Sequence, residues 1–176
     1  FTAFAVLLLA QEGKLSLDDE VQRWLPQLPR LGHTVTLRHL LHHTSGWRDY
    51  TDLLLINGMR EEAVATAADA LTALGRQSAL NFDPGSSFAY SNTGYFLLGQ
   101  VIERASGTTL RDLLRARIFQ PLGMTHTDVF DNHQRVFPGR ASSYSPVGSQ
   151  EWGVVTANWV QTGDGAIQTS VEDLAR

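Results

Sequence analysis

Apolar residues recur at helical spacing along much of the chain. Between residues 93 and 105 they fall on one stripe of a helix, at Phe96, Leu97, Val101 and Ile102. Gly107 follows where such a helix would end, because glycine readily adopts the left-handed conformation that closes a helix. Residues 109–119 repeat the pattern, with arginines on the polar side. The two segments predict consecutive helices.

The first ten residues, if helical, would be apolar on nearly every side of the helix. We expect a core helix here, with a buried stripe at Ala3, Val6, Leu7 and Ala10 and with Gly13 as its stop. The segment is too short to span a bilayer, and no positively charged flank of a signal peptide precedes it. The pattern therefore predicts a helix that packs within the protein.

Both ends of the chain resemble interrupted helices. No capping residue stands before Phe1 to accept the free amide groups of a first turn. Ser170, followed three residues later by Asp173, has the spacing of an N-cap, and the helix that it opens has only begun at Arg176. We expect residues 1–176 to be one partial domain that is truncated at both ends.

Capping residues and turn formers predict the remaining elements. Acidic side chains favour a helix start, threonine can cap a helix, and proline with glycine makes a turn. On these grounds we expect helices over residues 18–24, 37–43 and 61–74, a turn at 82–85 and an extended segment at 88–90. Residues 128–165 show no sustained period, and we expect one or two short strands there, near Val154 and Val155.

Composition narrows the possible chemistry. The 14 Lys and Arg against 18 Asp and Glu give a net charge of −4, so no basic surplus is available to bind nucleic acid. The chain has no cysteine, which excludes a thiolate nucleophile and a cysteine-bound zinc. Its 43% hydrophobic and 18% charged residues are typical of a folded domain with an apolar core. Catalysis must therefore use oxygen or nitrogen groups.

Tyr90-Ser91-Asn92 is the segment best suited to chemistry. In an extended stretch, side chains two residues apart point the same way, so Tyr90 and Asn92 are expected to face one cleft. A phenol can exchange a proton when a cation lies nearby, and a carboxamide can donate and accept hydrogen bonds. In the structural alternative, Tyr90 packs into the core and Asn92 caps the next helix, and the triplet alone leaves that alternative open.

Four segments in a fixed order extend this pattern. They are Leu40–Gly46 (LLHHTSG), Phe82–Tyr95 (FDPGSSFAYSNTGY), Gln120–Met124 (QPLGM) and Thr169–Arg176 (TSVEDLAR). Together they resemble the serine β-lactamase-related family, which contains class C β-lactamases, D-alanyl-D-alanine carboxypeptidases and family VIII esterase-like hydrolases. The resemblance implies an α+β fold of the β-lactamase/transpeptidase type. On that basis the chain is mostly the helical lobe, and most of the antiparallel sheet lies in sequence that is missing here.

The resemblance also implies roles for residues. The family site combines a Ser-x-x-Lys at a helix start, a Tyr-x-Asn loop and a Lys- or His-x-Gly strand, of which only the second matches here. By resemblance, Tyr90 assists proton transfer to and from the nucleophile, Asn92 orients the substrate amide or the lysine, and Ser91 faces away. The Ser-x-x-Lys is expected just upstream of Phe1, so the 176 residues alone are expected to be inactive.

For the parent protein, the resemblance implies acyl transfer to serine and hydrolysis of an ester, amide or β-lactam. It implies no metal and no organic cofactor, and it favours a periplasmic or extracellular location. The segment itself gives no reason to expect a membrane span or a nucleic-acid partner. An alternative of a different class stays open: a non-catalytic relative, or a helical binding module, that keeps the Tyr-x-Asn loop for its architecture.

Other candidate groups are weaker. Ser45 beside His42 and His43 lacks the strand and the glycine spacing of a nucleophile elbow. Together with His39, the two histidines share helical spacing, but no third ligand or general base completes a zinc site, so structural capping is the better interpretation. Trp47 and Tyr144 lie in loops that border the cleft in the family, and we expect both to contact substrate. The alternative is that they cover an edge of the core.

Overall fold

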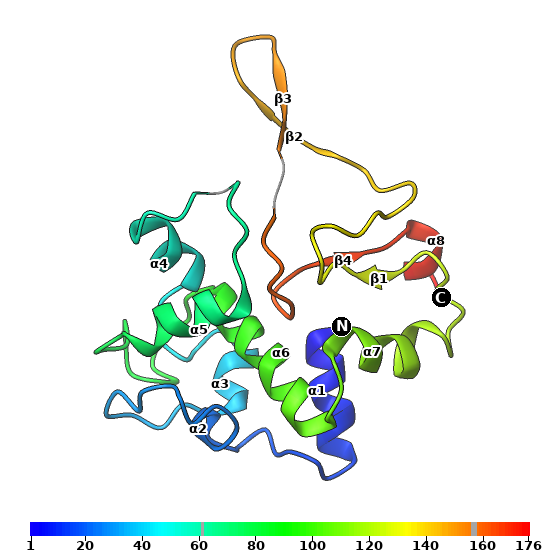
Figure 1. Ribbon diagram of the computed structural model, residues 1–176. Coiled ribbons are helices and arrows are strands. Elements are labelled where there is room, and N and C mark those ends of the chain that lie inside the picture. Colours follow the sequence, from blue (N-terminus) through cyan, green and yellow to red (C-terminus); the bar gives the residue numbers. More distant parts are fainter. Residues whose placement is uncertain (61, 156–157) are drawn as a thin grey trace.

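The computed structural model describes residues 1–60, 62–155 and 158–176 (Figure 1). Its long helix α6 (Asn92–Ser106) runs through the middle of the helical body. The helices that pack against it are α1 (Thr2–Gln11), α2 (Val21–Trp24), α3 (Leu37–Leu41), α4 (Tyr50–Ile56) and α7 (Leu110–Leu114). Helix α5 (Ala67–Gly75) packs on α4, and a π-helical turn (Arg115–Phe119) continues α7.

Helix α6 carries the apolar stripe that its sequence predicts. Its four stripe residues, Phe96, Leu97, Val101 and Ile102, are fully buried. Gly107 ends the helix in the left-handed conformation, with φ of +73°. Because neighbours cover α6 on several sides, its burial organises the core of the described chain.

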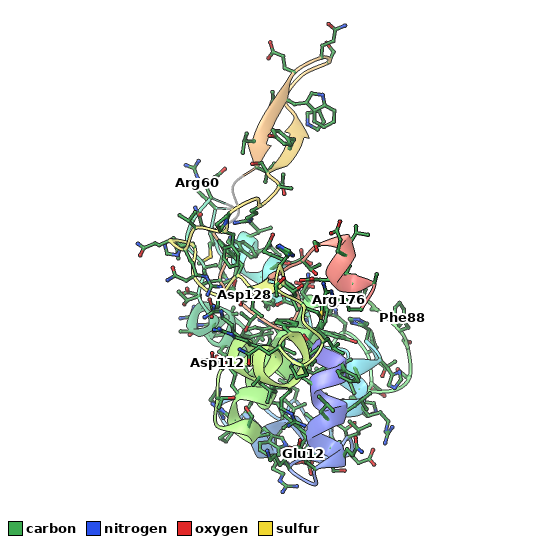
Figure 2. The ribbon with its side chains drawn as sticks, turned by 90° about the vertical axis from the view of Figure 1, so that its right-hand side faces the viewer. Glu12, Arg60, Phe88, Asp112, Asp128 and Arg176 are labelled. Atoms are coloured by element: carbon green, nitrogen blue, oxygen red, sulfur yellow. The ribbon has the colours of Figure 1, made fainter. Side chains whose placement is uncertain are left out.

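The strands are short and form two separate pairs. β1 (Asp128–Val129) pairs antiparallel with β4 (Ile167–Gln168), and β2 (Ser143–Pro146) pairs antiparallel with β3 (Trp152–Val155). The hairpin of β2 and β3 extends away from the helices in both views (Figures 1 and 2). Helix α8 (Val171–Leu174) follows β4 and is capped by Ser170. This mixture of helices with little sheet confirms the α+β prediction and the strand expected near Val154.

The buried face of α1 differs from the predicted stripe. Thr2, Ala5, Val6 and Leu9 are buried, whereas Leu7 is 50% exposed, so the prediction for Leu7 is wrong. The helix is apolar on every side, and its periodicity therefore could not distinguish the inner face from the outer one. Tertiary contacts make that choice. The Thr2 hydroxyl, for instance, donates to the carbonyl oxygen of Gly163 at 2.6 Å.

Several helix boundaries follow from local conformation. Helix α3 ends at Leu41 rather than at the predicted His43, whose φ of +55° lies in the left-handed region. Helix α5 begins at Ala67 because Thr66 forms a capping box with Asp69. Residue 61 lies outside the described residues, but residues 62–66 are described and are not helical, so the prediction of helix over them is wrong. Helix α4 was not predicted at all.

Within the described ranges, no helix is both long and apolar enough to cross a membrane.

A partly buried polar pair joins α4 to the loop before β4. The Tyr50 hydroxyl donates to Asp164 Oδ2 at 2.7 Å, and the Tyr50 ring packs against Phe96 and Trp159. Asp164 Oδ1 is buried with no hydrogen-bond partner among the described residues. Burial raises the pKa of the Asp164 carboxyl, although the Tyr50 hydrogen bond acts in the opposite direction. Burial and the charge of Asp164 likewise raise the pKa of Tyr50.

Close backbone contact holds the same loop against α6. A Cβ atom added at Gly99 would lie 2.7 Å from the carbonyl oxygen of Thr162 and 3.2 Å from Gly163 Cα. Because both obstacles are backbone atoms, no side-chain rotation relieves them. The loop of residues 162–163 therefore depends on the absence of a side chain at Gly99.

We expect Gly99→Ala to destabilise the protein, because the loop and α6 must separate to admit the methyl group. The free energy of unfolding should fall by about 1–3 kcal/mol, as in other overpacked cores. Urea denaturation measures the change. Gly75→Ala is the matched control, since a Cβ atom there meets no atom closer than 4.0 Å. Equal stability for Gly99→Ala and wild type would contradict the close contact.

The raised pKa of Asp164 predicts a pH-dependent stability. The folded state holds the Asp164 proton more tightly than the unfolded chain, whose Asp carboxyl has an ordinary pKa of 3.8. As pH rises above that value, the unfolded chain loses its proton first, so this residue's contribution to stability declines. The stability of Asp164→Asn relative to wild type should therefore increase from pH 4 to pH 7. Urea denaturation of both proteins at the two pH values measures it, and a pH-independent difference would refute the assignment. Asp52→Asn, at an exposed position, is the control.

Candidate active site

The Tyr-x-Asn segment lies where an extended loop enters α6. Ser91 is the N-cap of the helix, and its buried hydroxyl accepts a hydrogen bond from the Thr93 amide at 3.3 Å. Its extended backbone, with φ of −151° and ψ of 130°, places the two flanking side chains on the other side. Ser91 thus has the structural position expected of it, and Tyr90 and Asn92 are presented together.

Tyr90 and Asn92 contact each other directly. The Tyr90 hydroxyl donates to Asn92 Oδ1 at 3.1 Å, and Tyr90 is 65% exposed. The phenol is therefore outside the core, which removes the structural alternative in which Tyr90 is a packing residue. Figure 2 shows Phe88, two residues earlier on this loop, at the outer edge of the molecule.

Asn92 is held from the opposite side by Asp49. Asp49 Oδ2 accepts from the Asn92 main-chain amide at 2.6 Å and from its Nδ2 at 3.0 Å. Asp49 is also the N-cap of α4, where its Oδ1 accepts from the Thr51 amide at 2.8 Å. Asp49 was not predicted from the sequence. An aspartate ahead of an apolar run is a helix-start signal, but nothing in the sequence indicates its second contact, 43 residues away.

The His43 ring supports Tyr90 from behind. It packs against two tyrosine rings, with centroid distances of 4.7 Å to Tyr90 and 5.2 Å to Tyr95. Its Nδ1 accepts from the Ser91 amide at 3.4 Å, and its carbonyl oxygen accepts from the Ala89 amide at 3.0 Å. His43 therefore fixes the Tyr90 loop by stacking and by hydrogen bonds. From the sequence, His43 was considered as a base, as a metal ligand and as a structural cap, and its stacking on Tyr90 was not predicted.

The weaker candidates have structural positions. Ser45 is buried, and its hydroxyl accepts from the Trp47 amide at 3.3 Å. His39 Nδ1 accepts from the Thr36 amide at 3.3 Å, which completes the cap of α3, so the capping interpretation of His39 is confirmed. No cluster of three metal-ligating side chains occurs among the residues that the structure describes.

The two aromatic substrate candidates differ in their exposure. Trp47 is only 3% exposed, and its Nε1 is buried with no partner among the described residues. A ring so enclosed offers no face to a substrate, so the prediction for Trp47 does not fit this placement. Tyr144 is 60% exposed, but it lies opposite Val154 on the hairpin that projects from the helical body. Its contact with substrate stays a prediction.

The whole chain matches a known family. A family model described as Beta-lactamase matches residues 1–176. Penicillin-binding protein 4* of Bacillus subtilis is 40% identical over 146 residues, which cover 82% of this chain and 31% of the relative. A D-aminopeptidase of Cereibacter sphaeroides is 32% identical over 161 residues, covering 89% of this chain and 30% of the relative. This chain thus spans about a third of the length of these curated relatives.

A solved structure extends the match to three dimensions. The penicillin-binding protein of Bacillus halodurans superposes with a TM-score of 0.84 and 31% sequence identity. The superposition covers 99% of this chain and 53% of the other. Sequence and fold therefore agree over essentially every residue, and the chain belongs to the beta-lactamase family.

Proposed function

We propose that the longer protein to which this chain corresponds is a serine hydrolase that forms an acyl-enzyme, and that Tyr90 and Asn92 form one wall of its active site. One observation carries the proposal. An exposed phenol hydroxyl lies 3.1 Å from the carboxamide oxygen of Asn92, on the loop that matches the family's Tyr-x-Asn. A tyrosine kept for packing alone would bury its ring, as Tyr50 does in this chain.

In the proposed mechanism, the two side chains have different tasks. Tyr90 moves the proton: its oxygen receives the proton of the serine hydroxyl during attack and returns it to the leaving group. A lysine of the Ser-x-x-Lys motif, as the family has it, would favour the phenolate that accepts this proton. Asn92 orients the substrate amide or that lysine. Neither task requires a metal or an organic cofactor.

The names of the relatives suggest the substrate class. One is a penicillin-binding protein and another is a D-aminopeptidase. Both names fit attack on an amide bond. In penicillin this bond is the β-lactam, and in the substrate of a D-aminopeptidase it adjoins a D-amino acid. On the basis of these names, we propose amide or β-lactam substrates ahead of simple esters. Pocket shape and the third family motif make the final selection among them.

Removal of the Tyr90 hydroxyl is the direct test. In the intact protein, Tyr90→Phe should slow covalent labelling by a fluorescent penicillin or a fluorophosphonate by about 10²–10⁴-fold, the usual contribution of general acid–base catalysis. The time course of labelled protein on a gel gives the rate. Tyr95→Phe is the control, because its hydroxyl donates instead to the Leu41 carbonyl oxygen at 3.4 Å. Unchanged labelling of Tyr90→Phe would disprove the role, and an unlabelled wild type would support the non-catalytic alternative.

The 176-residue polypeptide should itself be inert. Its sequence contains one lysine, Lys14, and no Ser-x-x-Lys, so covalent catalysis has no nucleophile of that kind to begin with. We expect no hydrolysis of a chromogenic β-lactam and no fluorophosphonate adduct by mass spectrometry. An adduct on any of its own serines would show that a different nucleophile operates.

A further inference from the structure

Asp49 occupies the junction between α4 and α6 and uses both of its carboxylate oxygens. Oδ1 accepts from the Thr51 amide at 2.8 Å and from the Thr51 hydroxyl at 2.6 Å. Oδ2 accepts from the Asn92 main-chain amide at 2.6 Å and from Asn92 Nδ2 at 3.0 Å. A helix cap needs only the first oxygen. The second is therefore available for a separate task at Asn92.

The chemistry of the carboxylate decides how the Asn92 side chain is turned. An ionised carboxylate can only accept hydrogen bonds, so the NH₂ group of Asn92 must face Asp49. The carbonyl oxygen then has to face the Tyr90 hydroxyl, which becomes the donor across 3.1 Å. If the amide were turned the other way, its carbonyl oxygen would face the Asp49 carboxylate, and two hydrogen-bond acceptors would be in contact. The NH₂ group would then donate to the phenol oxygen.

We propose that Asp49 is a positioning residue of the active site: it fixes the direction of the Asn92 carboxamide and so presents an acceptor, rather than a donor, to Tyr90. The assignment rests on the proposed function of Tyr90 and Asn92. A carboxamide oxygen held in this direction accepts the phenol proton in the resting site. That proton must pass to another base, for which the lysine of the family motif is suited, before the phenolate can accept the serine proton. The direction of the carboxamide also leaves the lone pairs of the phenol oxygen free to face incoming groups.

A second set of hydrogen bonds makes this role separable from folding. Thr93 Oγ1 donates to the Arg48 carbonyl oxygen at 2.7 Å and accepts from the Tyr50 amide at 2.8 Å. These bonds hold the main chain on both sides of Asp49 against the start of α6 without using its side chain. Serine at position 49 would still cap α4, since serine is a good N-cap, but its shorter side chain cannot reach Asn92.

A double-mutant cycle in the intact protein tests the proposal. The labelling rate with a fluorescent penicillin is measured for wild type, Asp49→Ser, Asn92→Ala and the double variant. We expect Asp49→Ser to label about 10- to 100-fold more slowly than wild type, as expected for a misplaced reacting group. In the Asn92→Ala background, the same change should have less than about a twofold effect, because Asp49 acts through Asn92. Asp52→Ser, an equal change of charge at an exposed position of α4, should label like wild type.

Two outcomes would overturn the proposal. One is an Asp49→Ser variant that labels as fast as wild type. The other is a loss of the same size in both backgrounds, which would indicate a general structural effect. If Tyr90→Phe also labels normally, the proposed function fails with it. If Tyr90→Phe is slow while Asp49→Ser is fast, only the positioning role fails.

A spectroscopic measurement reads the orientation without any activity. The side-chain NH₂ signals of Asn92 are identified in a ¹H–¹⁵N spectrum by their loss in Asn92→Ala. In wild type we expect one of the two protons to be shifted downfield by its hydrogen bond to the carboxylate. The shift should be absent in Asp49→Ser. Signals that are the same in both proteins would refute the contact, even if the wild type proves to have no labelling activity.

Discussion

The beginning of α6 is the point on which both the core and the candidate site depend. Ser91 caps the helix, Thr93 ties it to the main chain on either side of Asp49, and the Asp49 carboxylate binds the next free amide. The first amide groups of any helix have no partner within the helix. Here the Thr93 amide donates to the buried Ser91 hydroxyl, and the Asn92 amide donates to the half-buried carboxylate of Asp49 from a distant part of the chain. The helix start and the segment of residues 48–50 therefore hold each other in place.

The same arrangement explains why the site faces outward from an otherwise buried helix. Asn92 occupies the first turn, where its side chain lies beside the cap rather than in the apolar stripe. Tyr90 precedes the cap and rests on the His43 ring, with its hydroxyl exposed. The buried core therefore ends one turn from Tyr90 and Asn92. For the role proposed for these two residues, such support would limit the reorganisation on substrate binding, as preorganised catalysis requires.

Local sequence patterns correctly predicted those helix stripes, stops and caps that depend on neighbouring residues. The stripe of α6, its glycine stop, the threonine cap of α3 and the serine cap of α8 all follow from neighbouring residues, and the structure agrees with each. The family assignment also came from short ordered motifs. Local information failed for α1, which is apolar all round, and for α4. That helix has only seven residues and follows a stretch rich in turn formers.

The sequence by itself therefore determined the helical character, the family and the Tyr90–Asn92 pair, since side chains two residues apart on extended backbone must share a side. Only the tertiary structure decided that Trp47 is enclosed, that His43 supports Tyr90 and that Asp49 holds Asn92. These last contacts join residues more than 40 positions apart. A carboxylate, an imidazole or an indole in a sequence has several possible partners, and the packing of α3 and α4 against α6 selects which of them comes within hydrogen-bond or stacking distance.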